Sequence, residues 1–158
     1  MSVIKKFFIG LRIVLLVFIT ASVWFLFSLF SEKDIAEMPE YYPFKSHRAK
    51  EQYLNYYDQR AQEWPVDSES KLVETSFGKT YVRISGPSTG SPLVLLPSTS
   101  ASSLVWMPNI EALSEHYQVY AVDNIYDYGR SVNTQNIKTP TDMTNWLDDL
   151  FTVLDLGD

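Results

Sequence analysis

The stretch LVLLPSTSASSLVW (residues 93–106) joins a continuous apolar run to a loop of small residues and then to an aromatic residue that opens a helix. An uninterrupted apolar run of this kind is typical of a strand covered on both faces. The small side chains that follow leave backbone N–H groups accessible, as an oxyanion hole requires. An ordinary Ser/Thr-rich strand–helix loop has the same composition. The stretch therefore predicts a buried strand and a loop whose chemistry depends on its context.

The segments around this stretch alternate between strand and helix patterns. Gly78-Lys79 separates two strand-like runs and predicts a hairpin, while Thr139-Pro140-x-Asp142 predicts the capped start of a helix. The predicted elements are strands at residues 72–77, 80–85, 93–96 and 118–122, and helices at residues 46–64, 105–114 and 141–154. A strand hairpin followed by strand–helix–strand–helix is the opening of an α/β sheet.

An apolar stretch, FFIGLRIVLLVFITASVWFLFSLF (residues 7–30), lies near the N-terminus and holds one charge, Arg12. About 20 mostly apolar residues suffice to cross a membrane, whereas the apolar region of a cleaved signal peptide is about 7 to 15 residues long. We therefore expect an uncleaved transmembrane anchor. Lys5, Lys6 and Arg12 predict a cytoplasmic N-terminus, with the rest of the chain outside the cytoplasm.

The composition of the chain after residue 30 excludes several classes of partner and site. Of 13 Lys and Arg residues three precede residue 31, which leaves ten against 19 Asp and Glu. This acidic balance argues against a nucleic-acid partner. The chain has no cysteine, so disulfides and thiolate metal sites are excluded. Nothing in the sequence indicates a metal or nucleotide cofactor.

The predicted organisation has four parts. They are a cytoplasmic stub and anchor at residues 1–31, a linker at 32–45, an amphipathic helix at 46–65 and an α/β domain at 71–158. Tyr53, Tyr56, Tyr57 and Trp64 recur at helical spacing in the third part. We expect this aromatic stripe to pack against the domain; a partner-binding surface is the alternative.

Gly86-Pro87-Ser88-Thr89-Gly90 satisfies the G-x-S-x-G pattern of serine hydrolases. In those enzymes a strand enters the serine and a helix leaves it, so that the hydroxyl is exposed on a sharp turn. Here strands both precede and follow Ser88, and proline and glycine are typical of a surface loop. We therefore interpret Ser88 as a residue without a catalytic role.

A second informative segment is YAVDNIYDYGRS (residues 120–131). Together with residues 93–106 it resembles the α/β-hydrolase superfamily, in particular its carboxylesterase-like bacterial members, over residues 74–158. In that family a strand ends in His-Gly and a small-residue loop that builds half of the oxyanion hole. A later strand ends in an aspartate followed by glycines and a serine, which Asp123, Gly129 and Ser131 match.

The resemblance implies that the backbone N–H of Thr99 or of Ser98 is the oxyanion donor. Two departures from the family pattern stand out: Pro97-Ser98 occupies the His-Gly position, and Tyr126 replaces a glycine. Proline has no N–H group, but Pro97 lies one place before the donor. The oxyanion function is therefore not excluded by it.

In the resembled family the nucleophile elbow, the acid and the histidine all follow the region matched here. The two histidines of this chain, His47 and His116, do not have the sequence position of a catalytic base, and we expect both at the surface. We expect the N-terminal fragment of a membrane-anchored serine hydrolase, inactive as given. A noncatalytic membrane-tethered binding module that reuses half of a hydrolase fold is the alternative.

Overall fold

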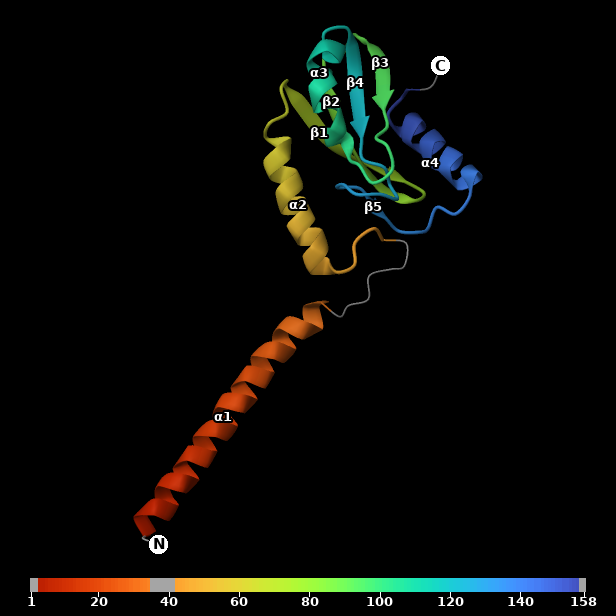
Figure 1. Cartoon of the computed structure of the whole chain (residues 1–158). Helices are drawn as coiled ribbons and strands as arrows, with labels where there is room; N and C mark the ends of the chain where they lie inside the picture. Colours follow the sequence, from red (N-terminus) through yellow and green to blue (C-terminus); the bar gives the residue numbers. More distant parts are fainter. Residues whose placement is uncertain (1–2, 35–41, 157–158) are drawn as a thin grey trace. The chain divides into compact units, whose positions relative to one another are not determined.

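The computed structural model describes residues 3–34 and 42–156, and the chain divides into the units Met1–Glu37 and Met38–Asp158. The first unit consists of helix α1 (Val3–Asp34) (Figure 1). Among the residues that were described, no helix has both the length and the hydropathy of a membrane span. The anchor expected over residues 7–30 stays a prediction. Residues 35–41 of the predicted linker lie outside the described residues.

The second unit is built on a five-stranded mixed sheet with the order β1-β2-β4-β3, in which β5 also pairs with β2 (Figure 1). The strands are β1 (Ser68–Thr75), β2 (Gly78–Ser85), β3 (Ser91–Leu95), β4 (Tyr117–Val122) and β5 (Val132–Asn133). β3 and β4 are parallel, and the other pairs are antiparallel. The carboxyl ends of β3 and β4 therefore meet at one edge of the sheet.

Each face of the sheet carries its own apolar cluster, as the alternation along β4 demonstrates. Tyr120 and Val122 pack with Trp146 of α4 (Pro140–Val153) on one face. Val119 and Ala121 pack on the other face with residues of η1 (Ser103–Trp106) and α3 (Met107–Ser114). Successive side chains of a strand point to opposite faces, so β4 contributes to both clusters. The result is a helix–sheet–helix arrangement, which confirms the predicted α/β class.

Helix α2 (His47–Ala61) begins after Ser46, whose side chain accepts a hydrogen bond from the N–H of Ala49 at 3.1 Å. This interaction is a typical N-cap. The helix ends three residues before the predicted position, and Trp64 follows as a buried residue that donates from Nε1 to Ser85 Oγ at 3.1 Å. Packing of the aromatic stripe is only partly confirmed, because Tyr57 is 1% exposed and Tyr56 is 61% exposed.

The hairpin between β1 and β2 turns two residues earlier than predicted. Ser76 and Phe77 form the turn, and Gly78 is the first residue of β2, with φ of 127°. A Cβ at Gly78 would lie 2.2 Å from the carbonyl oxygen of Val132 in β5. The glycine is therefore needed for the close approach of β5, a two-residue strand that the sequence did not predict.

Strand β3 differs from its prediction in position and in cover. It ends at Leu95, one residue before the predicted end, and Leu96 is 38% exposed. Among the described residues β3 pairs with β4 alone, so its other edge is unpaired within this unit. The last helix matches its prediction: Thr139 and Asp142 form a reciprocal capping box at its start.

Candidate active-site loop

The loops that follow β3 and β4 are joined by three side chains of the second loop. Asp123 accepts a hydrogen bond from the N–H of Ser103 at 2.7 Å. Asp127 accepts one from the N–H of Ser100 at 2.5 Å. Asn124 donates from Nδ2 to the carbonyl oxygen of Pro97 at 3.3 Å. The conformation of residues 97–103, which we call the β3 turn, is therefore imposed by side chains from the neighbouring parallel strand.

Asp123 is the best connected of these residues. It is fully buried, and its second carboxylate oxygen accepts a hydrogen bond from the N–H of Arg130 at 2.8 Å. Burial raises the pKa of Asp123, and the hydrogen bonds donated by the Arg130 and Ser103 N–H groups oppose that rise. Gly129 has φ of 148°, and a Cβ there would lie 2.6 Å from the carboxylate carbon. Only glycine permits this approach.

Ser131 completes the same arrangement. Its hydroxyl donates to the carbonyl oxygen of Asp123 at 2.6 Å and accepts from the N–H of Tyr81 at 2.9 Å. Asp123, Gly129 and Ser131, the three residues that carried the resemblance, thus act together to fix the loop after β4 against β2. Their structural role explains why these residue types occur at this spacing.

The β3 turn presents two backbone N–H groups. Ser100 has φ of 64°, and the N–H of Ala101 bonds to the carbonyl oxygen of Ser98 at 3.1 Å. Within residues 42–156, the N–H groups of Ser98 and Thr99 donate no hydrogen bond, and both residues are exposed. A fixed turn with free N–H groups is the geometry from which oxyanion holes are built.

Helix α2 contacts both the end of the β3 turn and the loop after β4. The Tyr57 hydroxyl and Ser103 Oγ lie 3.1 Å apart, and burial, then the charge of Asp123, raise the pKa of Tyr57. Arg130 forms an ion pair with Asp58 of α2, and its guanidinium lies 5.8 Å from the Tyr57 ring centroid. The loop after β4 is therefore tied to α2 as well as to the β3 turn.

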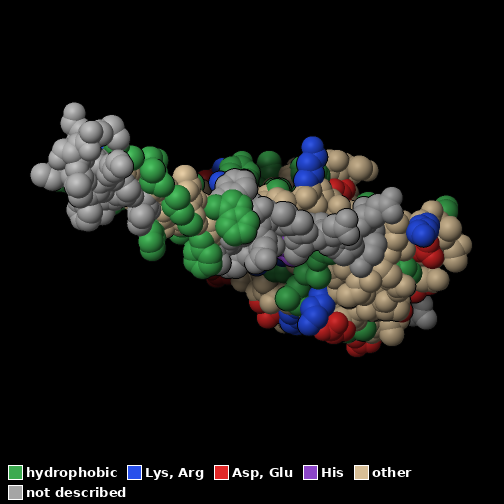
Figure 2. All heavy atoms as spheres, turned by 90° about the horizontal axis from the view of Figure 1, so that it is seen from below, with side chains coloured by type: hydrophobic (Ala, Val, Ile, Leu, Met, Phe, Trp, Pro, Cys, Tyr) green, Lys and Arg blue, Asp and Glu red, His purple; other side chains and the backbone are tan. Residues whose placement is uncertain are grey.

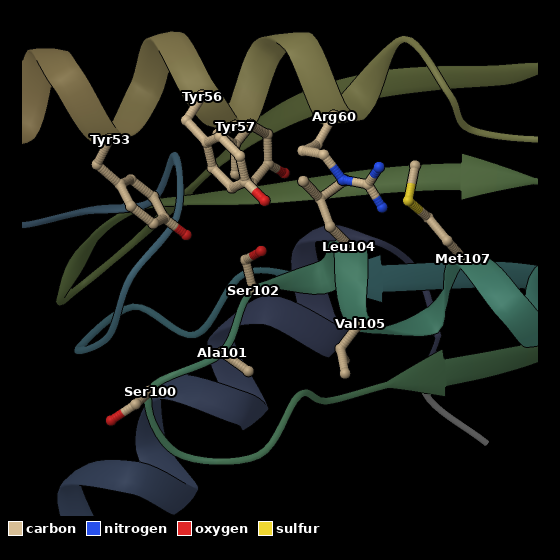
Figure 3. A pocket seen from close by; sticks show the side chains of 10 residues that line it. All are labelled: Tyr53, Tyr56, Tyr57, Arg60, Ser100, Ala101, Ser102, Leu104, Val105 and Met107. Atoms are coloured by element: carbon tan, nitrogen blue, oxygen red, sulfur yellow. The ribbon is translucent and has the colours of Figure 1, made fainter.

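A cavity of about 290 Å³ lies between α2 and the segment from the β3 turn to the start of α3. Figure 3 shows the side chains that line it, with tyrosines and Arg60 of α2 on one wall. Ser100, Ala101 and Ser102 of the β3 turn belong to the opposite wall. Ser98 and Thr99, whose N–H groups are free, directly precede the three residues of the β3 turn that line the cavity.

Ser88, His47 and His116, for which the sequence predicts no catalytic role, all lie on the surface. Ser88 is exposed in the loop between β2 and β3, at the end of the sheet opposite the β3 turn. His47 is exposed, and the His116 side chain is 75% exposed beside Glu115. The part of the chain that is described contains no cluster of three or more metal-ligating residues.

Sequence reasoning did not identify Asn124, Asp127 or Tyr57 as parts of this region. The available signal for the first two was the run of polar side chains directly after the apolar core of β4, since such positions lie at the carboxyl edge of the sheet. The partner of Tyr57 lies 46 residues further along the chain, so no local pattern indicated it.

The chain is similar in sequence to known carboxylesterases. No protein-family model matches the chain. Carboxylesterase YbfK of Bacillus subtilis (strain 168) is 39% identical over 104 residues, which cover 66% of this chain and 35% of the relative. The uncharacterized carboxylesterase nap of the same strain is 42% identical over 99 residues, covering 63% of this chain and 33% of the relative.

Solved structures of carboxylesterases are also similar to this chain. The crystal structure of naproxen esterase (carboxylesterase NP) from Bacillus subtilis matches with a TM-score of 0.66 and 40% identity, covering 70% of this chain and 38% of that one. The chain spans about a third of the length of the curated relatives it matches, at 35% and 33%. The described domain thus has part of the α/β-hydrolase fold, as its sequence predicted.

Proposed function

We propose that the Met38–Asp158 unit is the N-terminal part of a serine carboxylesterase domain and that it supplies the oxyanion-hole turn for hydrolysis of carboxylic esters. The observation that carries the proposal is the β3 turn, whose Ser98 and Thr99 N–H groups are unengaged among the described residues while Asp127 and Asn124 fix their neighbours. Similarity to carboxylesterases supports the reaction class.

In this proposal the N–H of Thr99 or of Ser98 donates to the oxygen that becomes negative when a nucleophile attacks the ester carbonyl. A donor that is fixed in advance needs no reorganisation during the reaction, which is why such groups lower the barrier effectively. Pro97 contributes only its carbonyl oxygen, which Asn124 holds. The side-chain hydroxyls of Ser98 and Thr99 are not required.

The polypeptide by itself is proposed to hydrolyse no ester above background. Its one G-x-S-x-G serine, Ser88, is exposed at the opposite edge of the sheet, and both histidines are exposed on the surface. Loss of the nucleophile and its base lowers kcat by about 10⁶-fold in a serine hydrolase even when the oxyanion donors stay in place. Hydrolysis of para-nitrophenyl butyrate by the purified chain, abolished by Ser88→Ala, would contradict this proposal.

A chimera tests the oxyanion function directly. Residues 46–156 would replace the matching segment of Bacillus subtilis carboxylesterase YbfK, and hydrolysis of para-nitrophenyl butyrate would be measured. We expect an active chimera in which Thr99→Pro or Ser98→Pro lowers kcat by about 10²- to 10³-fold, because one donor is removed. The matched control is Thr99→Ala, which keeps the N–H and should retain activity.

The alternative, a noncatalytic module, makes a different prediction for the same chimera. A chimera that unfolds cooperatively but hydrolyses nothing would favour that alternative. If both proline variants are as active as Thr99→Ala, the β3 turn has no part in the reaction, even though the chimera is an esterase.

We further propose that α1 anchors the protein in a membrane, with the Met38–Asp158 unit outside the cytoplasm. The apolar side chains described along α1 are largely exposed, with Phe18 at 70% and Trp24 at 72%, and hydrophobic side chains line the described part of this helix in Figure 2. Lys5 and Lys6 support the orientation.

A reporter fused after Asp158 should be active only in the form that requires export, and the chain should resist alkaline extraction from membranes. Release into the soluble fraction would contradict the anchor.

A further inference from the structure

We propose that the cavity between α2 and the β3 turn is a binding site for a small aromatic monocarboxylate. The proposal does not depend on esterase activity, because it concerns binding to the chain as it is. It rests on the composition of the cavity walls, on the position of Arg60 and on the charges near the opposite end of the cavity.

The cavity walls combine an apolar surface with aromatic faces. Leu104, Val105 and Met107 contribute apolar side chains, and Tyr56 stands across from them on α2 (Figure 3). Tyr56 and Val105 are 61% and 50% exposed, so two large apolar surfaces are left open to solvent here. A flat hydrophobic group that enters the cavity would bury part of its apolar and aromatic walls, which is favourable.

Arg60 supplies the charge. It is the one charged residue among the described residues that line the cavity; the remaining polar groups there are hydroxyls and backbone. Its Nη1 atom is paired with Glu63, and both side chains are largely exposed, at 45% and 60%. An exposed ion pair of this kind contributes about 0–1 kcal/mol, so a carboxylate can replace it. Guanidinium binds carboxylates in a bidentate geometry.

The opposite end of the cavity disfavours a carboxylate and so sets the orientation of the ligand. Tyr53 lies at that end, and its pKa is raised by burial and also by the negative charges of Asp123 and Asp127. Tyr53 and Arg60 are seven residues apart on one helix, a distance of about 10 Å at 1.5 Å per residue. We therefore infer that the carboxylate lies against Arg60 and the aromatic group against Tyr56 and the apolar wall.

The volume limits the size of the ligand. At about 290 Å³ the cavity is at the small end of ligand sites, which span about 300–1,000 Å³. A single ring with a short side chain fits this space, whereas a fused or extended ligand would project into solvent. The class is thus an aryl-alkanoic acid of one ring.

Hydrocinnamate and its uncharged analogue hydrocinnamyl alcohol are the matched probes. Their binding to the full chain in detergent micelles would be measured by saturation-transfer NMR and titration, with empty micelles as the blank. We expect the acid to bind more tightly than the alcohol. Arg60→Gln should weaken binding of the acid by on the order of tenfold, the effect of losing one charged hydrogen bond, and should leave the alcohol unchanged.

Two further variants sharpen the test. Glu63→Gln removes the competing partner of Arg60 and should tighten acid binding by about twofold to fivefold, within the range of an exposed ion pair. Lys71→Gln, which removes a cation paired with Glu69 on β1, is the control and should change nothing. Each variant would be checked for an unchanged thermal unfolding curve.

Three results would overturn the proposal. They are equal binding of acid and alcohol, failure of both to bind at millimolar concentration, and an Arg60→Gln variant that keeps its affinity for the acid. Tyr56→Ala tests the cavity independently of the charge. It should lower the affinity for both the acid and the alcohol, and unchanged affinities would show that the probes bind outside the cavity.

Discussion

Removing the carboxylate of Asp123 should destabilise the Met38–Asp158 unit more than any other single change in the loop after β4. In the folded protein this carboxylate accepts hydrogen bonds from the N–H groups of Ser103 and Arg130, at 2.7 and 2.8 Å, and it is fully buried. Asp123→Ala leaves both N–H groups without a partner, one of them buried and the other partly buried. Each buried donor that loses its partner costs about 1–3 kcal/mol, so we expect about 2–6 kcal/mol in total.

Asp123→Asn separates the hydrogen bonds from the charge. The amide keeps one oxygen as an acceptor but directs an NH₂ group at the second N–H, so one of the two hydrogen bonds is lost, at about 1–3 kcal/mol. It also removes the desolvation of a buried charge, the same effect that raises the pKa of Asp123. We therefore expect Asp123→Asn to be clearly less destabilising than Asp123→Ala.

Urea unfolding of the full chain, followed by the fluorescence of its four tryptophans, which include the buried Trp146, measures these differences. Asp148→Ala, at an exposed position of α4, is the control and should stay within about 0.5 kcal/mol of the unaltered protein. The reasoning fails if the Asn variant is as unstable as the Ala variant. It also fails if both variants behave like the control, because the two N–H groups would then have found other partners.

The other predictions concern α4 and the sheet edge. Thr139→Ala removes the N-cap of α4 and should lower the free energy of unfolding by about 1 kcal/mol in urea titrations, while Thr139→Ser should restore it. Asp149 accepts hydrogen bonds from the Ser76 hydroxyl and N–H, which lower its pKa, so its contribution to stability is present above the unfolded value of about 3.9 and is lost as the pH falls through its folded pKa. Unfolding midpoints at neutral and acid pH should therefore differ less for Asp149→Asn than for the unaltered chain. Strand β3 is unpaired on one edge in the described unit, so residues 46–158 alone should self-associate in analytical ultracentrifugation, and Leu96→Lys should increase the monomer fraction; a monomer with a sharp thermal transition would contradict this.

Elements governed by local chemistry could be predicted from the sequence. The start of α4 follows from Thr139-Pro140-x-Asp142, because the cap bonds join residues three apart. The α/β class follows from the order of strand and helix patterns. The turn of the hairpin could not be placed in this way. The sequence predicts Gly78 as a turn residue, but its positive φ permits the close contact with β5, about 54 residues further along the chain and beyond any local pattern.

The candidate site was predicted less completely than the fold. The resemblance to the α/β-hydrolase superfamily predicts Thr99 or Ser98 as the oxyanion donor, and the structure places both in an exposed turn. The residues that hold the turn, Asn124 and Asp127, are 27 positions away from their partners. A hydrogen bond of this sequence separation exists only once β3 and β4 are paired, so the sequence alone gives no account of why the turn is rigid.

The two hydrolase-like patterns of the chain show why position in the sheet decides which of them can carry chemistry. Ser88 satisfies G-x-S-x-G but lies where β2 ends and β3 begins, so a strand and not a helix follows it. The β3 turn matches no complete motif, yet it lies where two parallel strands end together and where side chains from one loop can fix the other. Backbone donors collect at that edge because the chain leaves both strands there. A short motif therefore predicts a site only when the strand and helix on either side of it are also present.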